Sequence, residues 1–140
     1  DGAYDGKHYQ LAETICYPQP VSKPHPPIMI GGSGEKKTLR FVAEYGDACN
    51  FDTGMGIEGI RHKLAVLKGH CEDIGRDYDQ IERTVIHHAS NPANTQAIVD
   101  FCGALAKEGV QHVIFNMHNV ETLEPLTHFA DKIIPETANF

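Results

Sequence analysis

The chain has 140 residues, a net charge of −7 and an apolar share of 41%, which together indicate one ordinary globular domain with a real core. Basic residues do not cluster, and no apolar run approaches the roughly 20 residues of a membrane span, so we expect neither a nucleic-acid nor a membrane partner. The four cysteines form no CxxC pair and the nine histidines show no zinc-ligand spacing, so we expect free thiols, no metal and a cytoplasmic location.

The first 27 residues predict an irregular arm lying on a surface. Residues 8–11 can form a short strand after the Asp5-Gly6 turn. The rest of the arm is rich in proline, which excludes regular helix and favours an extended chain. The chain also begins with Asp1 rather than Met, inside a turn-like segment, and we interpret it as a piece of a longer product.

From Ile28 onward, short apolar runs alternate with segments of helical periodicity, and this predicts four strand–helix units. The expected strands cover residues 28–30, 47–51, 81–90 and 110–117. The expected helices cover residues 35–45, 57–74, 95–107 and 121–134, the last closed by Pro135. Strict alternation implies an α/β fold with a parallel sheet. A small doubly wound sheet and one half of a (β/α)8 barrel, which in full has about 250 residues, both fit this pattern.

The most specific local motif lies between the first of these strands and its helix. It consists of Gly31, Gly32, Ser33 and Gly34, and either Ser33 or Gly34 is expected to cap the helix. Glycines there let the backbone approach a ligand closely, and free amides at a helix start favour an anion. We therefore predict a phosphate site, while a simple tight turn remains the alternative. The motif fits neither GxGxxG nor a P-loop.

These residues, with their surroundings, resemble the luciferase-like monooxygenase family, and most closely its branch that uses the deazaflavin coenzyme F420. The resemblance is strongest over residues 24–40, which read PHPPIMIGGSGEKKTLR, and at 47–50, which read DACN. Further matches lie at residues 6–9, within 62–77, and at 81–82, 109–110 and 135. They cover nearly the whole chain in the right order and correspond to the second half of the family's sequence.

The resemblance implies a (β/α)8 TIM barrel, with residues 28–140 forming its C-terminal half (four βα units) and residues 1–27 a proline-rich N-terminal arm. It also implies an oxidoreductase or monooxygenase that transfers hydride between coenzyme F420, or alternatively FMN, and a small organic substrate. The loop Gly31–Gly34 would hold the cofactor phosphate. The family's first four strands are absent from this chain, so no catalytic residue is assigned. We expect the missing N-terminal half-barrel, or a homo-oligomer, as partner.

Polar side chains near the ends of the later strands are candidates for the substrate or ring pocket. Asn50 follows the second strand, and His87 and His88 lie near the end of the third. Because side chains alternate along a strand, one of the two histidines should point into the barrel. Asn116 and His118 end the fourth strand and are equivalent candidates.

Two other interpretations remain open at this level. One is a non-catalytic fragment that binds a phosphate ligand or serves as an assembly partner, since half of the site is missing. The other is a small flavodoxin-like domain with an unrelated ligand. An open sheet with helices on both faces would support the flavodoxin-like domain. Helices confined to one face of a curved sheet would support the half-barrel.

Overall fold

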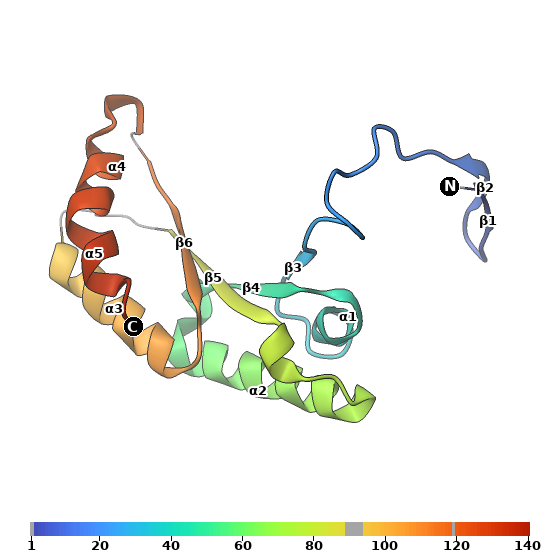
Figure 1. The fold of residues 1–140 in the computed structure, drawn as a ribbon. Coiled ribbons are helices and arrows are strands. Elements are labelled where there is room, and N and C mark those ends of the chain that lie inside the picture. Colours follow the sequence, from blue (N-terminus) through green and yellow to red (C-terminus); the bar gives the residue numbers. More distant parts are fainter. Residues whose placement is uncertain (1, 89–93, 119) are drawn as a thin grey trace.

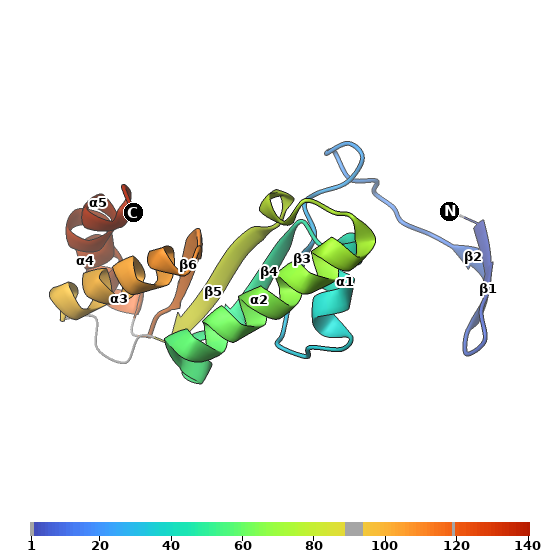
Figure 2. The ribbon, with the colours of Figure 1, turned by 90° about the horizontal axis from the view of Figure 1, so that it is seen from below.

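The computed structural model describes residues 2–88, 94–118 and 120–140. Its main element is a four-stranded sheet in which every pairing is parallel and the strand order follows the chain. The strands are β3 (Met29–Gly31), β4 (Ala48–Asp52), β5 (Glu82–His88) and β6 (His112–Asn116). Figures 1 and 2 show a twisted sheet whose covering helices lie on one side. A doubly wound sheet reverses its strand order and carries helices on both faces, so the described chain has the arrangement of consecutive (β/α)8 units in a barrel that is not closed.

The helices follow the strands closely, as predicted. They are α1 (Thr38–Tyr45), α2 (Gly56–Ile74) and α3 (Thr95–Lys107), with Asn94 capping α3 through its side chain. Short 3-10 turns at Thr53–Met55 and Tyr78–Gln80 complete the connections. Gly75 ends α2 in the left-handed conformation, with φ of 70°, which glycine adopts without steric cost.

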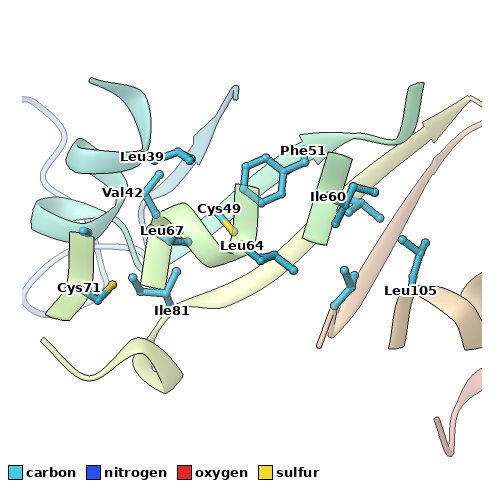
Figure 3. Close-up of a cluster of buried hydrophobic side chains, with 13 residues drawn as sticks. Leu39, Val42, Cys49, Phe51, Ile60, Leu64, Leu67, Cys71, Ile81 and Leu105 are labelled. Carbon is cyan, nitrogen blue, oxygen red and sulfur yellow. The ribbon is translucent and has the colours of Figure 1, made fainter. Parts of the chain in front are cut away.

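The core lies between the sheet and the helices α1 and α2. Phe51 and Cys49 of β4 point into it, and Leu39, Ile60 and Leu67 meet them from the helices (Figure 3). All five side chains are at most 1% exposed. Burying each large apolar side chain contributes about 1.5–3 kcal/mol. Burial also raises the pKa of the Cys49 thiol to about 11, so this cysteine is an inert core residue.

A second, smaller core cluster packs the end of the chain against α3 and β6. Its buried members are Ile98, Cys102, Phe129 and Ile133. The single helix predicted over 121–134 is wrong in detail. The segment consists of a 3-10 turn at Val120–Thr122, α4 (Glu124–His128), a π-helical turn at Phe129–Ile133 and α5 (Ile134–Thr137). Pro135 lies inside the last turn rather than after it, and the widened turn precedes it because proline has no amide hydrogen for the regular bond.

Three other expectations need correction. The apolar run of β3 is typical of a buried strand, but Met29 is 47% exposed because it lies on an edge strand and points to the side of the sheet away from the helices. Helix α1 begins at Thr38 instead of Glu35, and neither Ser33 nor Gly34 caps it. Strand β5 is described to His88, and the predicted end at Ser90 lies outside the described residues.

The N-terminal segment is more regular at its start than predicted. Strands β1 (Gly2–Asp5) and β2 (Gln10–Thr14) form an antiparallel hairpin around the Asp5-Gly6 turn. Residues 15–28 form no helix or strand. Figure 1 shows the hairpin well away from the main sheet. None of the described helices is long and apolar enough to cross a membrane.

Candidate functional site

The carboxyl ends of the four parallel strands meet at one edge of the sheet, and we call this edge the rim. Its last strand residues are Gly31, Asp52, His88 and Asn116. The register fixes their neighbourhood, because Gly31 pairs with Asn50 and His88 pairs with Asn116. Enzymes of the barrel class place their sites at this edge, so the rim is where a ligand is expected.

The two faces of the sheet differ in chemistry. Phe51 and Val85 point toward the helices and are buried in the core. Because side chains alternate, Asn50, Asp52 and Thr84 point to the opposite, helix-free face. Asn50 donates from Nδ2 to the Thr84 hydroxyl at 2.8 Å, and this hydroxyl donates to the carbonyl oxygen of Cys49 at 2.7 Å. The helix-free face therefore carries hydrogen-bonded polar side chains next to the rim, beside the apolar Ile86 and Ile114.

The glycine loop leaves β3 at the rim. Gly32 has φ of +120°, a conformation that L side chains rarely adopt. Its amide donates to the carbonyl oxygen of Asn50 at 3.1 Å, so it is not free as the sequence suggested. The amides of Ser33 and Gly34, in contrast, donate to no other part of the described chain. The part of the loop that can bind an anion therefore begins at Ser33.

The space around this loop differs from one glycine to the next. A Cβ added at Gly31 would meet no atom within 4 Å. A Cβ at Gly34 would lie 2.8 Å from the Thr38 hydroxyl oxygen, so a side chain there would require the Thr38 side chain to shift. The Thr38 hydroxyl thus stands against the loop as an additional donor. Open backbone, free amides and a hydroxyl are a donor set that suits a phosphate group.

A second polar group on the rim joins three consecutive strands. The Asn116 side-chain amide donates from Nδ2 to Nδ1 of His88 at 3.1 Å. Because Nδ1 accepts this bond, the ring hydrogen of neutral His88 lies on Nε2, which faces Oδ2 of Asp52 at 3.4 Å. The other oxygen of Asp52 accepts from the Gly54 amide at 2.7 Å, which holds the carboxylate in place. The sequence analysis named His88 and Asn116 as separate candidates, but residues on different strands gave no sign of this contact.

The adjacent histidines have opposite surroundings. His87 faces the helices and packs against Phe101 of α3, with ring centroids 4.8 Å apart. Its Nδ1 shares a hydrogen bond with the Thr53 hydroxyl at 2.8 Å. Burial lowers the pKa of His87, and the nearby His88 lowers it further. The alternation expected from the sequence thus places His88 on the helix-free face and His87 in the layer between sheet and helices.

The remaining candidate, His118, is exposed and follows β6 beyond the rim residue Asn116. A hollow of about 550 Å³ lies elsewhere, with Gly109, Val113, Phe129 and Phe140 among its lining residues. Gly109 precedes β6, so this hollow extends toward the end of the sheet opposite the rim. Within the described residues, no three His, Cys, Asp or Glu side chains are grouped to hold a metal ion.

Comparison with known proteins gives this geometry its context. Residues 2–131 match the family of luciferase-like monooxygenases. The chain belongs to that family. The match includes the glycine loop and the rim residues Asp52, His88 and Asn116, so the site lies within the matched family region.

One curated relative and one solved structure are similar to the chain. The FMNH(2)-dependent dimethylsulfone monooxygenase of Pseudomonas putida is 27% identical over 126 residues, which is 76% of this chain and 34% of that protein. An F420-dependent secondary alcohol dehydrogenase, solved with an F420-acetone adduct, superposes with a TM-score of 0.72 at 12% identity, over 96% of this chain and 55% of that one. The second likeness shows a shared fold. The chain spans about a third of the curated relative and about half of the solved structure.

Proposed function

We propose that this chain forms the cofactor-phosphate-binding part of an oxidoreductase that transfers hydride between coenzyme F420 and a small organic substrate, with FMN as the alternative cofactor. The single observation that carries the proposal is the glycine loop at the rim. There, Gly32 adopts a conformation reserved for glycine, and the amides of Ser33 and Gly34 are free. An FMNH(2)-dependent relative and an F420-dependent enzyme that shares the fold support the choice of ligand.

In this proposal each group of the chain has a defined task. The amides of Ser33 and Gly34 and the hydroxyl of Thr38 donate to the phosphate and fix the position of the cofactor along the rim. The bound cofactor supplies the hydride chemistry. Asn50 and His88 lie on the helix-free face and contact the ring or the substrate. His87 was an equal candidate from sequence, but its place against Phe101 removes it from the proposed pocket.

The arrangement of the rim suggests how His88 acts on a substrate. Asp52 and Asn116 engage both ring nitrogens and hold one tautomer. A substrate oxygen that replaces Asn116 at Nδ1 would donate its own hydrogen to that nitrogen. His88 would then orient the substrate and accept its proton, with the Asp52 carboxylate stabilising the imidazolium that forms.

The whole site also requires structure that this chain does not provide. We propose that a half-barrel corresponding to the first half of the family, or a second copy of the chain, covers the helix-free face. A non-catalytic phosphate-binding fragment is the second candidate function, because the chain spans only 34% of the curated relative.

A fluorescence titration tests the proposal. The protein is titrated with F420 and with FMN, and turnover is then followed with a panel of small alcohols and sulfones. Saturable binding of either cofactor together with turnover supports the oxidoreductase. Binding without turnover in the protein's complete form supports the non-catalytic fragment. If neither F420 nor FMN binds, both proposed functions are wrong.

A further inference from the structure

A cluster of polar side chains on α2 contacts the turn that follows the glycine loop. Lys63 donates from Nζ to Oε1 of Glu35 at 2.5 Å, and Nε2 of His62 lies 3.0 Å from the same oxygen. His70 donates from Nε2 to the backbone carbonyl oxygen of Glu35 at 2.7 Å. One loop residue is thus held at both its side chain and its main chain.

The cluster is built into the periodicity of α2. Lys63 and His70 are separated by about two turns and therefore lie on one face of the helix. The buried stripe of α2 consists of Ile60, Leu64, Leu67 and Cys71, so these polar residues flank the core rather than form it. Glu35 itself is exposed, and its hydrogen bonds to Lys63 and His62 lower the pKa of its carboxyl group. The contact therefore favours the carboxylate form of Glu35.

The main-chain contact has a directional consequence. In a planar trans peptide the N–H points opposite to the C=O, so holding the Glu35 carbonyl against His70 directs the Lys36 amide away from α2. The Gly34 carbonyl accepts from the Leu39 amide at 3.0 Å, which fixes the preceding peptide in the same way. Two consecutive peptide planes after the free amides of Ser33 and Gly34 are therefore oriented before any ligand arrives.

We propose that Glu35, Lys63 and His70 are positioning residues that preorganise the backbone of residues 33–37 for the phosphate of the cofactor. This inference rests on the proposed function. Helix α2 holds the loop in place, so the loop loses little conformational entropy when phosphate binds. The assigned effect is specific: losing the clamp weakens ligands through their phosphate and leaves the contacts of the ring system unchanged.

The main comparison in the test is between FMN and riboflavin, which differ only in the phosphate. FMN and riboflavin are titrated against the wild type and against His70→Leu, His70→Gln and Glu35→Ala, and F420 is compared with its phosphate-free deazaflavin fragment. We expect His70→Leu to weaken FMN or F420 about five- to tenfold, the effect of losing one hydrogen bond, and to leave the phosphate-free ligands unchanged. His70→Gln retains an N–H at the ε position and should restore most of the affinity. Lys68→Ala, an exposed change on the same helix, is the matched control.

The test distinguishes failure of the proposed function from failure of the positioning role. If the wild type binds FMN no better than riboflavin and F420 no better than its fragment, the phosphate loop itself is refuted. If the wild type discriminates but His70→Leu weakens both members of a pair equally, or neither, the positioning role is refuted while the proposed function stands. Circular dichroism verifies the fold of each variant. Glu35→Ala provides an independent reading, because Glu35 is exposed and lies outside the core.

Discussion

The two faces of the parallel sheet carry different kinds of side chain, although these side chains alternate residue by residue along the same strands. On the helix-facing side, Phe51, Cys49 and Val85 are buried and apolar, and they contribute stability. On the helix-free side, Asn50, Asp52 and His88 are polar and carry specific hydrogen bonds. Residues that stabilise the fold and residues of the candidate site are thus neighbours along the same strands. A mutation can therefore change one group without changing the other.

The largest expected effect is on the helix-facing side. Phe51→Ala removes a ring that is 1% exposed and should lower the free energy of unfolding by about 3–5 kcal/mol, because a cavity remains. Met29→Ala, at a side chain on the helix-free face that is 47% exposed, should cost less than about 1 kcal/mol. Chemical denaturation measures both. Equal losses would mean that the two faces do not differ as described.

The next effect concerns the backbone of the glycine loop. Gly32→Ala introduces a side chain at φ of +120° and against Thr38, a strain of about 1–3 kcal/mol. We expect a loss of cofactor affinity of about tenfold, measured by fluorescence titration. Gly69→Ala on α2 is the matched substitution, since its Cβ meets no atom within 4 Å. It should leave affinity unchanged and stabilise the helix by about 0.5–1 kcal/mol.

The adjacent histidines sharpen the comparison further. His88→Ala should reduce kcat/KM by about tenfold with little change in unfolding, because His88 lies at the rim and its proposed role is to orient the substrate. His87→Ala should do the reverse and lower stability while sparing kcat/KM, because its ring packs against Phe101. Steady-state kinetics and thermal melts of the two variants measure these effects. The opposite pattern would mean that the roles assigned to the two histidines are reversed.

The smallest effect is a dependence of stability on pH. Burial lowers the pKa of His87 below its ordinary value of 6.5, so the unfolded chain binds a proton more readily than the folded one. The contribution of His87 to the free energy of unfolding is therefore fully present above about pH 6.5, and it is lost as the pH falls through the lowered pKa. Denaturation at a series of pH values should show the decline, and His87→Gln should flatten it. A slope unaffected by the substitution would assign the titration to another group.

The fold was largely predictable because apolar periodicity is a local signal. The runs around Ile30 and Val113 and the stripe of α2 placed the strands and helices to within a few residues. The π-helical turn before Pro135 was not predictable, because a proline can end a helix or be accommodated in it by a widened turn. The packing of Phe129 and Ile133 against α3 and β6 favours the second outcome here. The late start of α1 had a similar cause, since the turn at residues 35–37 is held by α2.

The candidate site was predictable only in part. The glycine loop is continuous in sequence, so its composition was visible at once. The contacts that organise the site join distant residues: His70 lies 35 positions from Glu35, and Asn116 lies 28 positions from His88. Only the register of the parallel strands and the packing of α2 bring such residues together, and no sequence pattern encodes those distances.

The position of β3 at the edge of the described sheet has a further consequence. Its outer side offers unpaired main-chain groups to any strand that extends the sheet. The glycine loop begins where this edge ends, so a strand docking there would run alongside the phosphate site. A ligand that contacts both the loop and the added strand would stabilise their association. By linkage, the association would increase the affinity for the ligand by the same factor.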